Sequence, residues 1–340
     1  MERKLATIQV VKEIRPIPDA DAIECADILG WHLVVKKGQF KPGDKCVYFE
    51  IDSLLPERPQ FEFLRKSCWN ARLAGFRIKT VTMRGQISQG IAFPLSILPQ
   101  GNYNVGDDVT ELLGIRKYEP PVPACLTGVE KGPIPPIIPK TDEPRIQIIP
   151  EVLERYREVR FYVTEKLDGT SCTIYHHQGT FGACGRTYEY EEDETNTYWK
   201  VAKMYDLRSK LAAAGSIAIQ GEIVGPNIQD NIYKLPNHKL FVFNVFEIEK
   251  HRYLGLNEMR SLCTTLGLEP VPLIDDDFHL PLSVDELVQY SQAASVLYKD
   301  TIREGVVVRP VEEIKDPTLG RLSFKVVNPR YLLKREVQES

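Results

Sequence analysis

The sequence predicts an α+β protein of two domains, in which a small OB-like β-barrel precedes a larger domain of antiparallel sheets with flanking helices. At 340 residues, the chain is too long for one ordinary core and too short for three. Nine of its 24 prolines fall between residues 119 and 150. They separate a part made of short strand-like runs from a part that mixes strand and helix patterns.

The first part, residues 1–118, is predicted to be the barrel. It contains five short runs rich in β-branched and aromatic residues, separated by turn-forming residues such as Lys41-Pro42-Gly43-Asp44. An OB-like fold is the natural candidate, because five strands close into a barrel with few exposed edges. The predicted strands are residues 4–11, 31–35, 45–51, 77–82 and 91–95.

Residues 119–145 are predicted to form an extended connector over the surface. Proline fixes φ and lacks a backbone donor, so the run around Pro133, Pro135, Pro136 and Pro139 excludes a helix or a central strand. Residues 146–340 then form the second domain. Its predicted strands are 161–164, 171–176, 180–183, 217–224, 240–248 and 305–309, and its predicted helices are 196–214, 257–266 and 283–298, each opened by an Asn or Ser that can cap.

Composition excludes several classes of protein. No run reaches the roughly 18 to 20 apolar residues of a membrane helix, and residues 1–10 lack the apolar core of a signal peptide. Seven scattered cysteines without a C-x-x-C pair favour free thiols in a reducing compartment, cytoplasm or nucleus, over disulfides or zinc. The net charge of −4 taken alone argues against the class of nucleic-acid coat proteins. This value is an average over basic and acidic segments of the chain.

Charged residues recur at the mouths of apolar strands in the second domain. Lys166-Leu167-Asp168-Gly169 follows the apolar strand 161–163. Alone, this four-residue pattern is common and would describe a charged hairpin turn. The repetition of the arrangement along the chain is hard to explain by core packing. The later elements, in order, are Gly185-Arg186-Thr187, Glu222, the strand around Phe243, Glu304-Gly305 and Lys325.

In this order the blocks resemble the motifs of the covalent nucleotidyltransferase superfamily, which contains ATP-dependent RNA and DNA ligases and mRNA-capping enzymes. The DNA ligases and capping enzymes carry an OB domain after the last lysine motif, whereas here 15 residues follow Lys325 and the barrel comes first. The chain is therefore most similar to RNA ligases with an N-terminal OB domain. Phrases at residues 17–24, 43–52 and 140–147 carry the same resemblance, which implies an ATP-grasp-like adenylyltransferase domain.

The resemblance implies an ATP-dependent RNA ligase that forms a lysyl-AMP intermediate, transfers AMP to a 5′-phosphate end and seals it to a 3′-OH RNA end, at duplex nicks. Lys166 and Lys325 would be the catalytic residues, and Asp168, Glu222 and Glu304 would hold Mg²⁺ or Mn²⁺. A monomer is expected. The residues expected to bind ATP are Glu165, Arg186, Glu222, Phe243, Glu304, Lys325 and Gln147.

Two chemical expectations follow. A free lysine is protonated at pH 7, so the pKa of Lys166 must fall through a neighbouring positive charge or a metal. The last motif often contains Lys-x-Lys in such ligases, but its third position here is Val327. The sequence leaves open whether Arg309, Arg321 or Arg330 supplies the second charge.

The first domain contains the signal for an RNA partner. Residues 65–84 hold six basic residues and no acid, interleaved with aromatic rings. Basic groups neutralise phosphates and aromatic rings stack on bases, although a merely solvated basic face is the alternative. The candidate RNA-binding residues are Arg65, Lys66, Trp69, Arg72, Arg77, Lys79 and Arg84.

Two other functions remain open from the sequence. A capping-type guanylyltransferase also uses Lys-x-Asp-Gly, and the absence of a C-terminal OB domain weighs against it. A non-catalytic OB-fold RNA-binding protein would carry a decayed second domain, and the intact Lys166, Glu222, Glu304 and Lys325 weigh against that.

Overall fold

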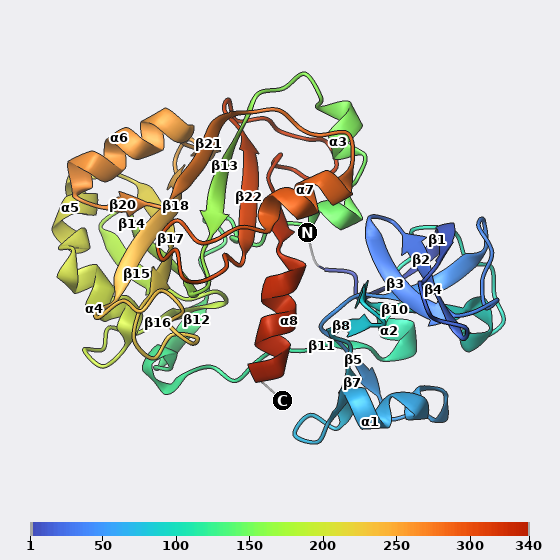
Figure 1. Cartoon of the computed structure of the whole chain (residues 1–340). Coiled ribbons are helices and arrows are strands. Elements are labelled where there is room, and N and C mark those ends of the chain that lie inside the picture. Colours follow the sequence, from blue (N-terminus) through green and yellow to red (C-terminus); the bar gives the residue numbers. More distant parts are fainter. Residues whose placement is uncertain (1–2, 339–340) are drawn as a thin grey trace.

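The computed structural model describes residues 3–338, which form an OB-like domain and an α+β domain with the helix α8 (Pro329–Gln338) between them (Figure 1). The OB-like part is built on an antiparallel sheet in the order β10-β4-β1-β2-β3. β1 (Ala6–Pro16) pairs with β4 through its first half and with β2 through its second half, and a bulge between Val11 and Glu13 bends it. The other strands are β2 (Ile23–Ile28), β3 (Trp31–Lys36), β4 (Lys45–Phe49) and β10 (Ile91–Pro94).

The expected OB-like barrel is thus confirmed, with differences in its strands. β2 was missing from the prediction, and the expected strand 77–82 is split because β7 (Gly75–Arg77) ends where a new hairpin begins. β7 belongs to a second small sheet, in the order β11-β5-β7-β6. The remaining elements of this part are β5 (Ser53–Pro56), β6 (Trp69–Asn70), the hairpin β8 (Thr80–Met83) with β9 (Gln86–Gln89), α1 (Arg65–Cys68), α2 (Thr110–Leu113), η1 (Pro59–Leu64), η2 (Leu95–Ile97) and β11 (Arg116–Lys117).

The proline-rich connector packs on the second domain. It contains η3 (Ala124–Leu126) and β12 (Glu130–Pro133), and β12 pairs with β16 (Tyr188–Tyr190) at the edge of a sheet. Leu126 and Ile138 are buried against this domain. Proline is tolerated in an edge strand, because the lost donor would face away from the ladder. The connector therefore contributes no central strand, as expected. It does contribute an edge strand, β12, which was not expected.

Two antiparallel sheets form the second domain. The larger has the order β12-β16-β15-β14-β17-β18-β19, with the short β20 parallel to β18, and the smaller has the order β21-β13-β22-β23. The strands are β13 (Phe161–Lys166), β14 (Thr170–His177), β15 (Thr180–Cys184), β17 (Ile217–Val224), β18 (Lys239–Glu247), β19 (Arg252–Tyr253), β20 (Glu269–Pro270), β21 (Leu273–Phe278), β22 (Gly305–Pro310) and β23 (Phe324–Val327).

Helices cover these sheets and bury their apolar sides. α4 (Thr197–Met204), α5 (Leu207–Ala214) and α6 (Leu256–Leu266) share one core with β14, β17 and β18. η4 (Ile146–Ile148), α3 (Val152–Arg155) and α7 (Val284–Ser291) share another with β13, β22 and β23. Asn196 and Ser283 cap α4 and α7 as the sequence predicts.

The helix boundaries differ from the prediction. The expected helix 196–214 is two helices, because Asp206 adopts a left-handed conformation with φ 50° between them. The expected helix 283–298 ends at Ser291, and α6 begins at Leu256 with Glu258 accepting a bond from the Gly255 N–H. None of the helices between residues 3 and 338 has the length and apolar character that crossing a membrane demands. The seven cysteines are all free.

The two domains contact each other directly. The Gly30 N–H, in the turn after β2, donates to the Gln147 carbonyl at 2.9 Å. A Cβ at Gly30 would lie 3.0 Å from the Gln147 Cα, so a larger residue there would push the two backbones apart by a few tenths of an ångström. His32 of β3 contacts Asp285 of α7, at 2.9 Å between Nε2 and Oδ1. These contacts place the OB-like domain beside the mouths of β13, β22 and β23.

Candidate active site

A cavity of about 400 Å³ lies where the two sheets of the second domain meet the OB-like domain. Most of the charged residues that the sequence singles out line it. Its walls come from the OB-like domain, the connector and α8 as well as from the two sheets. The lining residues include Arg77, Arg145, Lys166, Asp168, Glu222, Phe243, Glu304, Lys325 and Arg335.

The pairing of β13 with β22 brings Lys166 to Glu304. Lys166 lies opposite Gly305 in this ladder, and its Nζ is 2.7 Å from a Glu304 carboxylate oxygen. Burial alone would lower the pKa of Lys166, but Glu304, Glu222 and Asp168 outweigh it and raise that pKa. This raised pKa is opposite to the lowered pKa that the sequence predicts for a nucleophilic lysine. The lysine is thus held protonated by the same carboxylates that a divalent cation would neutralise.

The turn between β13 and β14, which runs from Lys166 to Gly169, packs closely against β17 because residue 169 is glycine. A Cβ on Gly169 would lie 2.3 Å from the Ile223 carbonyl oxygen, so only glycine fits there. The next strand, β14, pairs Ser171 with Glu222. The turn and this ladder together bring Asp168 and Glu222 to the same side of the cavity as Glu304.

The three carboxylates crowd one another in a poorly hydrated place. Burial and the nearby Glu304 raise the pKa of Asp168 to about 6. Burial also raises the pKa of Glu222 to about 8, although Lys166 opposes it. A set of three carboxylates with unfavourable mutual repulsion suits a hard divalent cation such as Mg²⁺ or Mn²⁺, which prefers oxygen ligands.

Lys325 on β23 adds positive charge to the cavity. Burial, Lys166 and Arg145 lower its pKa to about 7. Of the arginines considered for the second charge, Arg309 is buried and bonded to Glu143, while Arg321 and Arg330 do not line the cavity. Arg145 lines it and forms a β-bridge with Lys325. This position beside β23 was not predicted, because no local pattern shows which strand Arg145 will meet.

A β-bulge directs Phe243 into the cavity. Gln220 of β17 pairs with Asn244 of β18, but the next residue, Gly221, pairs with Val242. Phe243 is therefore the extra residue of the bulge, which re-aims its side chain. Phe241 and Phe246 are buried in separate cores, so Phe243 is the ring of this strand that lines the cavity.

Three of the expected nucleotide-binding residues have other surroundings. Arg186 lines the cavity but is exposed and pairs with Asp142 at 2.7 Å. The carboxylate of Glu165 is buried and accepts a bond from the Val296 N–H, and its other oxygen has no partner among residues 3–338. Gln147 is buried at the domain interface and does not line the cavity. Glu165 nevertheless lines the cavity, although its carboxylate is engaged by Val296, and Gln147 alone of the three lies outside the cavity.

The basic segment of the OB-like domain is dispersed. Arg77 lines the cavity and Lys79 lies near it, and both form ion pairs with Glu336 of α8. Arg65 pairs with Glu57 and Glu62, and its guanidinium lies 4.2 Å from the centre of the Trp69 ring. That ring face is therefore already covered by Arg65. Lys66, Arg72 and Arg84 are exposed on the surface.

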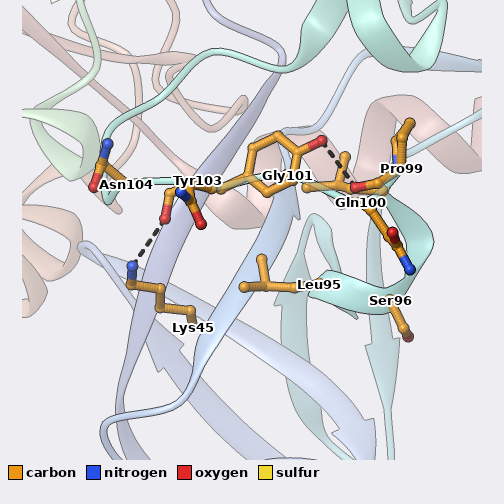
Figure 2. A pocket seen from close by; sticks show the side chains of 10 residues that line it. Lys45, Leu95, Ser96, Pro99, Gln100, Gly101, Tyr103 and Asn104 are labelled. Atoms are coloured by element: carbon orange, nitrogen blue, oxygen red, sulfur yellow. Dashed lines mark hydrogen bonds between the residues drawn. The ribbon is translucent and has the colours of Figure 1, made fainter.

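A second, wide-open depression lies at the outer end of the OB-like domain (Figure 2). Lys45 is its one charged residue, and its Nζ donates to the Tyr103 carbonyl at 2.8 Å. The Tyr103 hydroxyl donates to the Pro99 carbonyl at 3.1 Å. These two bonds, drawn in Figure 2, join the loop to Lys45 of β4 and to itself. The candidate active site is therefore the interdomain cavity and not this depression.

Together the fold and the cavity define a nucleotidyltransferase with an OB-like domain at its N-terminal side. A family model described as an OB-fold domain matches residues 5–95, and one described as RNA ligase matches residues 159–327. A Naegleria gruberi RNA ligase mutant without ligand is 37% identical with a TM-score of 0.92, and 99% of each chain is covered. The chain belongs to the RNA ligase family with an N-terminal OB-fold domain and a C-terminal nucleotidyltransferase domain.

Other structures of the same relative contain ligands. One Naegleria gruberi RNA ligase mutant with ATP and Mn is 38% identical with a TM-score of 0.90, over 98% of each chain. The structure with pyrophosphate is 37% identical with a TM-score of 0.90, over 100% of each chain. No protein among the curated sequences matches the chain.

Proposed function

We propose that this chain is an ATP-dependent RNA ligase that becomes adenylylated on Lys166 and seals a 5′-phosphate end to a 3′-OH RNA end at duplex nicks. The observation that carries the proposal is the position of Lys166, which is 2.7 Å from Glu304 and shares its cavity with Asp168, Glu222 and Lys325. ATP and Mn in the structure of the relative support the choice of cofactors.

In the first step, Lys166 Nζ attacks the α-phosphorus of ATP. An N–P bond forms, the bond to pyrophosphate breaks, and the lysine proton leaves to solvent. A bound Mg²⁺ or Mn²⁺ would neutralise Asp168, Glu222 and Glu304 and the phosphates, which favours the deprotonated amine. Lys325, with Arg145 beside it, is placed to stabilise charge on the departing phosphates. Phe243 would stack on adenine, and Arg186 would bind phosphate once it leaves Asp142.

In the second step, the RNA 5′-phosphate attacks the AMP phosphorus, a pyrophosphate linkage forms and the N–P bond to Lys166 breaks. In the third, the 3′-OH attacks the 5′-phosphorus, the phosphodiester forms and AMP leaves. The exposed Lys66, Arg72 and Arg84 would neutralise RNA phosphates.

We also propose that the chain consists of an OB-fold domain at residues 1–118, a connector at 119–145 and a nucleotidyltransferase domain at 146–340. The extent of the matched OB-fold model, residues 5–95, and the packing of the connector on the second domain support these boundaries.

The proposal is tested with α-labelled ATP and Mn²⁺, followed by denaturing electrophoresis. The wild-type chain is expected to become labelled, and Lys166→Ala is expected to lose the label because Lys166 is the amine held against Glu304. Lys200→Ala, which changes an exposed lysine of α4, is the matched control and should label normally. Labelling of Lys166→Ala at the wild-type level would contradict the mechanism.

Substrate arms of the experiment separate the alternatives. Labelling by GTP in preference to ATP would favour a capping-type guanylyltransferase, and RNA binding without any labelling would favour a non-catalytic OB-fold protein. Two nicked duplexes that differ only in a 3′-OH RNA or a 3′-OH DNA end test the preferred substrate. Faster sealing of the RNA end is expected, and equal rates would remove that part of the proposal.

A further inference from the structure

The C-terminal helix α8 reaches both the Lys166 turn and the OB-like domain, although no sequence motif marks it. Figure 1 shows it between the two domains. Residues four apart on a helix share a face, so Tyr331 and Arg335 both point toward the same neighbour. Glu336, the next residue, points to the adjacent side. The two faces contact different domains.

One face of α8 holds both oxygens of the Asp168 carboxylate. The Tyr331 hydroxyl donates to Oδ2, and Arg335 Nη1 donates to Oδ1 at 3.3 Å. Asp168 and Tyr331 are buried, so these bonds have little competition from water. Arg335 also donates to Gln229, in the loop after β17, at 2.7 Å. The carboxylate is therefore fixed in orientation by a helix more than 160 residues away in the sequence.

The other face of α8 is bound to the OB-like domain. A Glu336 carboxylate oxygen lies 3.4 Å from Arg77 Nη2, and the other lies 3.2 Å from Lys79 Nζ. These side chains are between 10% and 21% exposed, so the ion pairs are screened less than surface pairs. This part of α8 thus connects the end of β7 and the segment just before β8 in one domain to the turn after Lys166 in the other.

We propose that Tyr331 and Arg335 are positioning residues of the ligase reaction, which fix the carboxylate of Asp168, and that Glu336 makes this placement depend on the docking of the OB-like domain. The inference rests on the proposed function, in which Asp168 acts beside Lys166. Without its two partners, the Asp168 side chain would rotate away from the orientation that the cation and the nucleotide require. Loss of such an orienting contact typically costs about 10- to 100-fold in activity or metal affinity.

The first experiment measures single-turnover formation of lysyl-AMP across a series of Mn²⁺ and ATP concentrations, without RNA. Tyr331→Phe and Arg335→Gln are expected to lower the maximal rate or the apparent Mn²⁺ affinity about 10- to 100-fold, with the KM for ATP changed less than threefold. Arg335→Lys keeps a donor and should recover part of the loss. Lys334→Gln, an exposed position on the same helix, is the control and should behave as wild type.

The second experiment is a double-mutant cycle of Lys79→Gln and Glu336→Gln in the same assay. If the two residues act through their ion pair, the double variant should be no slower than the slower single variant. Thermal unfolding of every variant shows whether it is folded at the assay temperature. Wild-type rates and Mn²⁺ dependence in folded Tyr331→Phe and Arg335→Gln would overturn the positioning role, and strictly additive losses in the cycle would overturn the coupling.

Whether the wild-type chain forms lysyl-AMP distinguishes a failure of this inference from a failure of the proposed function. If the wild-type chain forms no lysyl-AMP, the proposed function fails and the positioning role fails with it. If the wild type is labelled and the α8 variants are unaffected, the proposed function stands and this inference alone is wrong.

Discussion

At the scale of single residues, the two lysines of the cavity have opposite electrostatic surroundings. The carboxylates raise the pKa of Lys166, whereas burial and positive neighbours lower that of Lys325 to about 7. The Lys166 amine is therefore kept protonated while the carboxylates carry their charge. Lys325 is held near the midpoint of its titration at neutral pH, so its charge responds to small changes in pH or in bound phosphate.

The ionisation of Lys325 predicts the pH dependence of ATP capture. Below pH 7 its ammonium is present to attract phosphate, and above pH 7 the free enzyme loses this charge. We expect kcat/KM for ATP in lysyl-AMP formation to lose the contribution of this charge as the pH rises above 7, because this ratio reports the free enzyme. Lys325→Arg keeps its charge at all these pH values and should remove this component. Superimposable profiles of wild type and Lys325→Arg would contradict the assignment.

At the scale of elements, strand pairing determines which side chains meet. Gly305 begins β22, and a Cβ there would lie 2.2 Å from the Val326 carbonyl oxygen and 2.9 Å from the Val327 Cα of β23. The glycine therefore lets β22 and β23 approach closely. The pairing of β13 with β22 places Glu304 beside Lys166, and the pairing of β22 with β23 brings Lys325 to the same cavity.

Gly305→Ala is expected to disturb this pairing. Because the added methyl meets backbone on the neighbouring strand, β23 must shift, and Glu304 must move relative to Lys166. We expect lysyl-AMP formation to fall by about 100-fold or more, the size of effect that a displacement of about 1 Å produces. Gly179→Ala is the control, because its turn has open space around a Cβ and only a left-handed φ of 78°. It should cost about 1 to 2 kcal/mol of stability and leave labelling intact. Equal labelling rates in the two variants would count against the argument.

The elements also show where prediction from sequence succeeded. Lys166, Asp168, Glu222, Glu304 and Lys325 converge as expected, because each lies at the mouth of a strand whose apolar pattern is local. Phe243 reaches the cavity through a bulge, and the pattern of alternating side chains contains no sign of it. The position of α8 was not predicted, since it is set by contacts with Asp168 and Lys79 that no local pattern encodes.

At the scale of the whole molecule, a histidine links the two domains. His32 Nε2 is 2.9 Å from Asp285 of α7, and its Nδ1 is 2.7 Å from Asp27 of β2. Arg15 pairs with Asp27 and also contacts His32, and the Cys25 thiol lies beside them. The bond to Asp27 and the charges of Asp285 and Asp27 raise the pKa of His32 despite burial.

This linkage predicts that the stability of the docked domains depends on pH. A raised pKa in the folded state means that the stabilisation is complete below the unfolded value of about 6.5 and is lost as the pH rises through the folded value. We expect wild type to have a melting temperature roughly 1 °C lower at pH 8.5 than at pH 6 from this source, since a partly exposed pair contributes about 1 kcal/mol or less.

His32→Gln is expected to remove this component of the pH dependence, measured by calorimetry at both pH values. Asp285→Asn should reduce it without changing the core of either domain, because Asp285 is mostly exposed. A pH dependence that is the same in wild type and in both variants would show that His32 does not link protonation to stability.

Taken by itself, the sequence determined the α+β class, the order of the two domains and the charged residues near the strand ends that line one cavity. These features depend on local pattern, spacing and residue type, which a linear chain displays directly. Only the tertiary structure decided that Arg145 accompanies Lys325, that Arg65 covers Trp69, and that α8 holds Asp168 and binds Arg77 and Lys79. The physical reason is that ion pairs and close backbone contacts depend on distances in space between groups far apart along the chain.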